Sequence, residues 1–365
     1  MPINVTFHPV RSAVVLLLGL PLVMLLAGGV AAITAHHDFS RNIFRGLRWG
    51  LGAEVAFVFV MAVVGASYQA ISSIREQRLY PPPGKLVDIG GYRLHLYCSG
   101  EGGPTVILDY GRVGSYLDWY HVQPQVARFA RVCSYDRGGY GWSDPSPKPR
   151  LPSAMAEELY TLLTKAGEKP PYVLVGHSFG GFDVLMYAHK YRDEVAGIVL
   201  VDGSHPDQRL PFHWRDKLWL RMMQVTAPFG LPRCRRWCGG GPAENASTRT
   251  AIFCRSHVYR TDYDQWAAFP KGAEEVRRLG ALGDLPLHVV SRDPDRKPSS
   301  DDPTFSTRER HWLKLQQELL QLSSNATHTI AAGSGHDVMT DRPDVVVQAI
   351  RQTMEKARKR WLGSF

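Results

Sequence analysis

The stretch Val173–Gly181, VLVGHSFGG, places a serine between two glycines, directly after a run of aliphatic residues. Its G-x-S-x-G pattern alone arises by chance about 0.2 times in a chain of this composition. A strand before the motif and a helix after it form a sharp turn that exposes the serine hydroxyl. Because both neighbours are predicted here, Ser178 is the candidate nucleophile. The backbone N–H of Phe179 is then a candidate donor to an oxyanion.

A serine hydroxyl becomes a nucleophile when a base takes its proton. His336 lies in the loop GSGHDV, after the predicted strand HTIAAG and before the last predicted helix. This place gives the chain order serine, acid, histidine. His336 is therefore the candidate base, whereas His177, beside the serine, is expected to pack near the site.

A carboxylate should hold the imidazole in the correct tautomer. The strand LHVVSR is followed by Asp293 and Asp295, and Asp202 ends the strand AGIVLVDG. We expect Asp295, because the loop after LHVVSR should lie nearer the histidine loop in a doubly wound sheet. Asp293 is the next candidate, and Asp202 or the nearby Asp207 stays open.

The second oxyanion donor should come from the turn after the strand TVILDYG. This turn is Gly111–Gly114, and the backbone N–H of Arg112 is the candidate partner of Phe179. A glycine-rich surface turn without a catalytic role is the alternative.

Predicted strands alternate with helices from residue 80 onward, and most strands are continuous apolar runs. This alternation is typical of an α/β domain with a mostly parallel, doubly wound sheet. The pattern stops at about residues 204–283, where tryptophans and paired arginines replace it, and resumes afterwards. We therefore expect one domain over residues 80–365, with a helical cap inserted at 204–283.

Two apolar stretches precede this domain. Residues 12–34 carry no charge, and residues 50–71 carry only Glu54, so each has the length of a transmembrane helix. Residues 1–79 are therefore predicted to be a multi-pass membrane anchor. A cleavable signal peptide is the alternative for the first stretch, and an interfacial helix for the second. The balance of arginines and lysines slightly favours an extracytoplasmic domain.

The net charge of +9 comes from scattered basic residues, without a nucleic-acid recognition motif. We expect a membrane neighbour rather than nucleic acid. No metal motif, phosphate loop or dinucleotide fingerprint is present, so neither a metal nor a cofactor is expected. A disulfide among Cys234, Cys238 and Cys254 would favour export, but free thiols fit the sequence equally well. The oligomeric state stays open.

From about Lys85 to its end, the chain resembles the α/β-hydrolase fold enzymes. The resemblance rests on five motifs in the family's order: DYGRVGS, YDRGGYGWSD, GHSFGG, LVDGSHPD and GSGHDV. Two departures stand out, since Tyr110 replaces the usual histidine before Gly111 and Arg292 replaces the usual glycine after the seventh strand.

The resemblance implies a hydrolase but leaves the substrate open, because the fold hosts many activities. Serine at the turn disfavours dehalogenases and epoxide hydrolases, whose nucleophile there is an aspartate. We expect a carboxylic ester, and the composition of the predicted cap suggests a lipid-like or aromatic one. An acyltransferase or a peptidase would use the same triad. A catalytically silent, membrane-tethered binding protein is the alternative outside enzymes.

Overall fold

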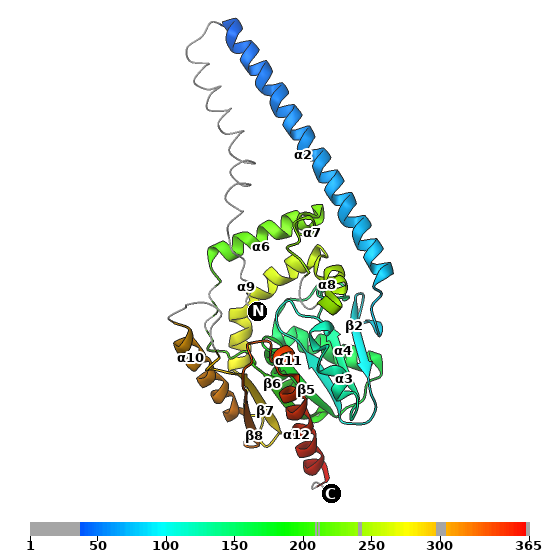
Figure 1. The fold of residues 1–365 in the computed structure, drawn as a ribbon, viewed down its shortest axis with the longest axis vertical. Helices are drawn as coiled ribbons and strands as arrows, with labels where there is room; N and C mark the ends of the chain where they lie inside the picture. The colour runs from blue at the N-terminus through cyan, green and yellow to red at the C-terminus, as the bar shows by residue number, and fades with distance from the viewer. Residues whose placement is uncertain (1–36, 209, 211, 240–242, 297–303, 363–365) are drawn as a thin grey trace. The chain divides into compact units, whose positions relative to one another are not determined.

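The computed structural model describes residues 37–208, 210, 212–239, 243–296 and 304–362 (Figure 1). The chain forms two compact units. One holds residues 1–71 together with Pro228–Gly230, and the other holds the remaining residues.

The long helix α2 (His37–Leu79) begins in the first unit. Its last residues, from Ser72 onward, belong to the second unit. Its segment Phe44–Leu79 contains an 18-residue window with a mean hydropathy of 1.9, and no residue of that window is buried in the protein. The predicted segment 50–71 lies inside α2, whereas the predicted segment 12–34 lies outside the described residues. One helix in the described part of the chain is thus long and apolar enough to cross a membrane, so a multi-pass anchor is not established.

The second unit is built on an eight-stranded sheet with the order β1-β2-β4-β3-β5-β6-β7-β8. β1 and β2 are antiparallel, as are β2 and β4, and all other neighbours are parallel. The mostly parallel sheet predicted from the alternating pattern is therefore confirmed. The strands are β1 (Lys85–Asp88), β2 (Arg93–Ser99), β3 (Thr105–Asp109), β4 (Val132–Asp136), β5 (Tyr172–His177), β6 (Val195–Val201), β7 (Leu287–Arg292) and β8 (Ala326–Ala331).

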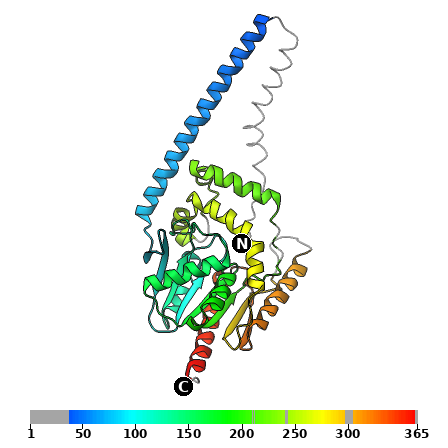
Figure 2. The ribbon, with the colours of Figure 1, turned by 180° about the vertical axis from the view of Figure 1, so that it is seen from behind.

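Helices cover both faces of this sheet, as the two opposite views show (Figures 1 and 2). Between and after the strands lie η1 (Tyr116–Trp119), α3 (Gln123–Val126), α4 (Pro152–Ala166), α5 (Gly180–Lys190), η2 (Arg192–Glu194), α10 (Phe305–Glu318), η5 (Leu319–Leu322), α11 (Val338–Asp341) and α12 (Pro343–Leu362). The longer helices α4, α5 and α12 bury apolar residues against the sheet, as amphipathic helices do.

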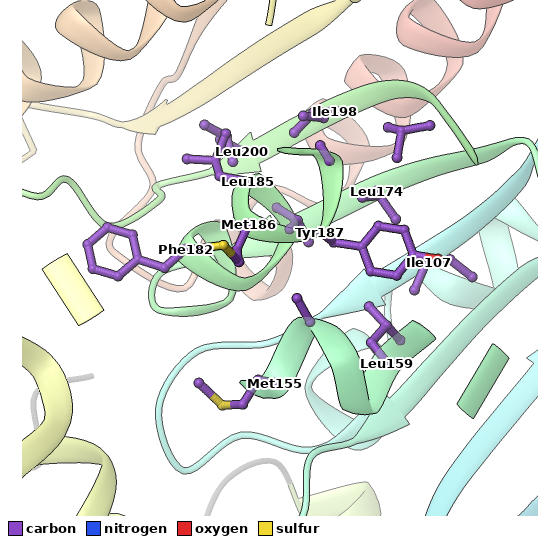
Figure 3. Packing of buried hydrophobic residues seen from close by; sticks show 14 of the residues in the cluster. Ile107, Met155, Leu159, Leu174, Phe182, Leu185, Met186, Tyr187, Ile198 and Leu200 are labelled. Atoms are coloured by element: carbon purple, nitrogen blue, oxygen red, sulfur yellow. The ribbon is translucent and has the colours of Figure 1, made fainter. Parts of the chain in front are cut away.

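The buried hydrophobic residues of the described chain form three clusters, and two of them lie on opposite faces of the sheet. Along β5, Leu174 points into the cluster beneath α4 and α5, whereas Val173 and Val175 point into the cluster beneath α3 and α12. Figure 3 shows the first cluster, in which Tyr187 of α5 and Ile107 of β3 lie near Leu174. Because both faces of β5 are buried, the strand reads as the continuous apolar run that precedes the serine.

The segment between β6 and β7, here called the insertion, is helical. It contains α6 (Trp214–Thr226), η3 (Ala227–Phe229), α7 (Leu231–Cys234), η4 (Ala243–Asn245), α8 (Ala246–Phe253) and α9 (His257–Arg277). α6 packs against α9, and a disulfide joins Cys238 to Cys254. A second disulfide joins Cys98 to Cys133, which are direct partners on β2 and β4, and Cys234 is free and exposed.

Candidate active site

Ser178 lies in the turn between β5 and α5, with a left-handed backbone φ of +50°. This conformation is strained for a residue with a side chain, and it persists where the surroundings enforce it. The glycines of the motif make the turn possible. A Cβ at Gly176 would lie 2.6 Å from the carbonyl oxygen of Gly180, and a Cβ at Gly180 would lie 2.7 Å from that of Asp109.

His336 follows β8 and reaches Ser178 from the other side of the site. Its Nε2 lies 3.0 Å from Ser178 Oγ, within hydrogen-bond distance for removal of the hydroxyl proton. The loop that carries the imidazole is fixed, because the backbone N–H of Gly335 donates to Asp341 Oδ2 at 2.6 Å. The His336 side chain is 40% exposed, so a substrate has access to it.

Asp202, at the end of β6, is the carboxylate that the structure brings to this imidazole. The His336 Nδ1–H donates to Asp202 Oδ2 at 2.6 Å, and the Asp202 side chain is fully buried. Asp202 lies next to Ser178 because β6 is the direct neighbour of β5 in the sheet. The chain order serine, acid, histidine is kept.

The expectation of Asp295 as the acid is therefore wrong in geometry. Asp295 is exposed, and its backbone N–H donates to Asp293 Oδ1 at 2.9 Å. Asp293 Oδ2 accepts from the backbone N–H of Gly333 at 2.7 Å, so Asp293 joins two loops rather than holding the imidazole. Asp207 is exposed and forms an ion pair with Arg277.

Two further side chains hold the Asp202 carboxylate. The Arg292 guanidinium donates to Oδ2 at 2.8 Å, and the Trp312 indole N–H donates to Oδ1 at 2.6 Å. Burial alone would raise the pKa of Asp202, but Arg292 and the donors from His336 and Trp312 bring it well below its ordinary value. Arg292 also pairs with Glu309 at 2.6 Å. The residue that replaces the family's usual glycine is thus a direct partner of the acid.

His177 supports the histidine loop from beneath. Its Nε2–H donates to the backbone carbonyl of His336 at 2.9 Å, and burial lowers the pKa of His177 to about 3. A neutral imidazole therefore packs under the site. Tyr110, the other departure from the family pattern, donates its hydroxyl to Asp337 Oδ1 at 2.9 Å and so connects the turn after β3 to the same loop.

The turn after β3 approaches Ser178 closely, since a Cβ at Gly111 would lie 3.0 Å from Ser178 Cβ. The buried Arg137 guanidinium donates to the Gly111 carbonyl and, at 2.8 Å, to Asp183 of α5. It thereby joins the turn to the helix behind the serine. In the described part of the chain, neither the Arg112 nor the Phe179 backbone N–H donates to a protein acceptor. Both donors are free for a substrate oxygen.

The insertion places aromatic and cationic groups near this turn. The Arg112 guanidinium pairs with Asp262 of α9 and lies 4.6 Å from the centre of the Trp266 ring, on which Phe212 stacks at 5.2 Å. The Phe179 ring lies 6.2 Å from that of Phe269. The Phe179 and Phe269 side chains are buried, so these contacts make an apolar wall with one neutralised cation near Ser178.

Two other features lie apart from this constellation. A cavity of about 420 Å³ is lined by residues that include His205, Arg277 and Glu318, but by none of Ser178, His336 and Asp202. Among the described residues, Cys98, Cys133 and Glu168 bring potential metal-ligand atoms within 4.8 Å of one another. The two sulfurs are joined as a disulfide, so they offer no thiolate to a metal.

Sequence reasoning missed Arg292, Trp312, Tyr110 and Asp337 as neighbours of the site. For Tyr110 and Arg292, the departure from the family pattern was a sequence signal that could have pointed to the site. Trp312 lies in a helix without a motif, so its contact with Asp202 had no sequence signal.

A family model described as alpha/beta hydrolase fold matches residues 104–231. A curated protein from Hormonema carpetanum, named as a probable transporter, is 27% identical over 301 residues, covering 74% of this chain and 42% of its own length. The Bacillus subtilis protein YqjL is 26% identical over 269 residues, which cover 73% of this chain and 90% of YqjL. A vacuolar membrane protein of Saccharomyces cerevisiae is 30% identical over 134 residues, which cover 32% of this chain and 21% of the yeast protein.

The chain therefore spans about half the length, or less, of several curated relatives that it matches. It covers 42% of the H. carpetanum protein, 56% of the B. subtilis protein YbdG and 21% of the yeast protein.

Solved structures resemble the chain in fold. A thermophilic esterase from Thermogutta terrifontis superposes with a TM-score of 0.54 at 19% identity, covering 75% of this chain and 98% of that one. An enol-lactonase from Burkholderia xenovorans gives a TM-score of 0.55 at 18% identity, covering 74% and 100%. At such identities the likeness concerns the fold alone.

Proposed function

We propose, from the premise that this chain belongs to the α/β-hydrolase fold superfamily, that it is a membrane-anchored serine hydrolase of carboxylic esters. The observation that carries the proposal is one chain of hydrogen bonds. It runs from Ser178, held in a left-handed turn, through His336 to the buried Asp202. This is the geometry by which a serine hydroxyl becomes a nucleophile.

In the first half of the reaction, Ser178 Oγ attacks the ester carbonyl carbon while His336 Nε2 takes the hydroxyl proton. The carbonyl electron pair moves to oxygen, where the backbone N–H groups of Phe179 and Arg112 stabilise the negative charge. Collapse of this intermediate breaks the bond to the alcohol, whose oxygen receives the proton from His336. An acyl group then remains on Ser178.

In the second half, water attacks the acyl carbon and gives a proton to His336 Nε2. The new tetrahedral intermediate collapses, the carboxylic acid leaves, and Ser178 Oγ regains its proton. Throughout, Asp202 keeps the Nδ1–H of the imidazole directed toward itself and stabilises the charged ring. No metal or cofactor takes part in these steps.

The aromatic side chains beside the serine support an apolar acyl or alcohol group as the substrate class. Phe179 directly precedes α5, Phe269 and Trp266 belong to α9, and the Arg112 guanidinium lies over the Trp266 ring. Burial of a few methylene groups against such rings contributes about 0.8 kcal/mol per group. We therefore propose a lipid-like or aromatic ester.

Membrane anchorage and an extracytoplasmic catalytic unit complete the proposal. The apolar segment Phe44–Leu79 supports the anchor. The disulfides Cys98–Cys133 and Cys238–Cys254 support an oxidising compartment for the second unit, because such bonds are rare in the cytosol.

Fluorophosphonate labelling of the full chain tests the nucleophile. Wild type should take up the probe, and Ser178→Ala should not, while both proteins keep the same circular dichroism spectrum. Equal labelling of the two, or no labelling of either, would contradict the proposal, and the second result would favour a silent binding protein.

An acyltransferase or a peptidase would use the same three residues and label in the same way. A panel of esters of rising acyl length, measured with and without added alcohol or amine acceptors, separates these activities. Hydrolysis should predominate, and turnover that depends on an acceptor would show acyl transfer instead.

A further inference from the structure

The helix α6 of the insertion has an apolar row on its outer face. Leu220 and Met223 are buried, whereas the exposed fractions of Trp214, Leu218 and Val225 are 72%, 61% and 66%. Positions 214, 218 and 225 differ by four and seven residues, so the three side chains lie on one side of the helix. Large apolar side chains aligned in this way mark a surface that another phase or partner covers.

Cations flank this row, and no exposed acid accompanies them. Arg215, Lys217 and Arg221 are exposed, although the Arg221 guanidinium lies 3.7 Å from the centre of the Tyr263 ring and the Lys217 Nζ lies 5.3 Å from that of Phe212. The one acidic residue of α6, Asp216, is half-buried and accepts a hydrogen bond from the backbone N–H of His213, at the start of the helix. The outer face therefore presents apolar side chains between positive charges, the pattern of a helix that lies in the headgroup region of an anionic bilayer.

Within the first unit, the short segment that follows α6 in the chain packs against the apolar helix α2. Pro228–Gly230 belongs to that unit, where a Cβ on Gly65 of α2 would lie 2.4 Å from the Phe229 carbonyl oxygen. Gly230 lies against Tyr68 and Gln69 of the same helix. α6 ends at Thr226, and the chain enters this segment of the first unit at Pro228.

We propose that the outer face of α6 docks on an anionic lipid surface, with Trp214, Leu218 and Val225 in the headgroup region and the flanking cations beside lipid phosphates. A tryptophan in the row fits this place, since its ring is apolar and its N–H is polar. The inference deepens the proposed membrane anchorage, which it assumes. It places the insertion beside a supply of lipid-like esters.

The test uses the full chain in vesicles of phosphatidylcholine with or without phosphatidylglycerol. In a Cys234→Ser background, Leu218→Cys carries an environment-sensitive fluorophore, and Glu355→Cys on the exposed side of α12 is the matched control. With brominated lipids, emission from position 218 should fall about twofold or more in anionic vesicles, as for a group at the headgroup boundary. Emission from position 355 should stay constant.

The charge term has its own variant. Lys217→Gln with Arg221→Gln should lower the equilibrium constant for docking in anionic vesicles about fivefold for each cation removed. Solvent-like, unquenched emission from position 218 in anionic vesicles would overturn the proposal. Equal quenching in neutral vesicles would refute the electrostatic part.

Two measurements on the same samples keep this result apart from the parent proposal. Resistance to alkaline carbonate reports on the anchor, and hydrolysis of a water-soluble ester reports on the triad. An unquenched fluorophore in a chain that resists carbonate and hydrolyses the ester would remove the docking face alone. Loss of ester hydrolysis with quenching intact would remove the proposed activity alone.

Discussion

At the scale of single residues, Asp202→Asn gives the sharpest expectation. The amide can no longer accept the Nδ1–H of His336 with a full negative charge, so the imidazole loses its tautomer and its charge partner. We expect kcat for a soluble ester to fall about 10⁴-fold with the fold retained. Asp295→Asn, at an exposed position, should keep kcat within about twofold. A loss at Asp295 as large as that at Asp202 would restore the acid expected from sequence.

Arg292 should affect the pH profile because its guanidinium shares Asp202 with the imidazole. Arg292→Gln removes a positive charge whose repulsion disfavours protonation of the nearby base, His336. The low-pH side of the kcat/KM profile should therefore move to higher pH by about half a unit or more. Arg260→Gln, which removes the same charge at an exposed site on α9, is the control. Identical profiles for all three proteins would show that Arg292 has only a structural role.

His177 should make stability depend on pH. Its pKa is lowered from 6.5 to about 3, so between these values the unfolded chain binds a proton that the folded chain does not. The free energy of unfolding must then decrease as pH falls, by up to about 1.4 kcal/mol per pH unit.

His177→Gln keeps an N–H donor for the His336 carbonyl but does not titrate. Between pH 7 and pH 5, the melting temperature of the detergent-solubilised variant should therefore drop less than that of wild type. His189→Gln, an exposed histidine, should behave as wild type. Parallel pH dependences for wild type and His177→Gln would contradict the assignment.

At the scale of elements, the turn after β3 acts through its distance from the nucleophile. A Cβ at Gly111 would lie 3.0 Å from Ser178 Cβ and 3.1 Å from His177 Nδ1, so Gly111→Ala should displace the turn by a few tenths of an ångström. We expect kcat to fall about tenfold to a hundredfold with a smaller change in KM, because the oxyanion donors shift. Gly280→Ala, where an added Cβ meets nothing within 4 Å, should be neutral. Equal kcat and KM values for both variants would show that the turn accommodates the added methyl group without moving the oxyanion donors.

The elements also explain which site residues sequence could predict. Ser178 and His336 can be predicted from local patterns. Ser178 lies in a turn between a strand and a helix, and His336 lies in a loop after the last strand. The acid does not, because it depends on which strand end faces the imidazole. Asp202 and Asp295 both follow strands, and only the arrangement at the strand ends, with Arg292 directed toward Asp202, separates them.

At the scale of the whole molecule, the alternation of strand and helix patterns predicted the sheet, but it did not predict which distant strands and cysteines pair. α2 begins at His37, earlier than hydropathy predicts, because a helix continues through charged residues that an apolar window excludes. The Cys98–Cys133 disulfide requires β2 to lie beside β4, a neighbour relation that no local pattern contains. Disulfide pairing is thus a property of topology rather than of cysteine spacing.

The two disulfides lead to a prediction about the compartment of the whole catalytic unit. Of the 5 cysteines, only Cys234 is free and exposed, so an impermeant maleimide added to intact cells that express the chain should label one thiol. Cys234→Ser should abolish this signal, while a cytosolic marker stays unlabelled. Denaturation with a reductant should make all 5 thiols reactive. Labelling that requires permeabilised cells, or that reaches several thiols without reductant, would place the unit in a reducing compartment, where such disulfides do not persist.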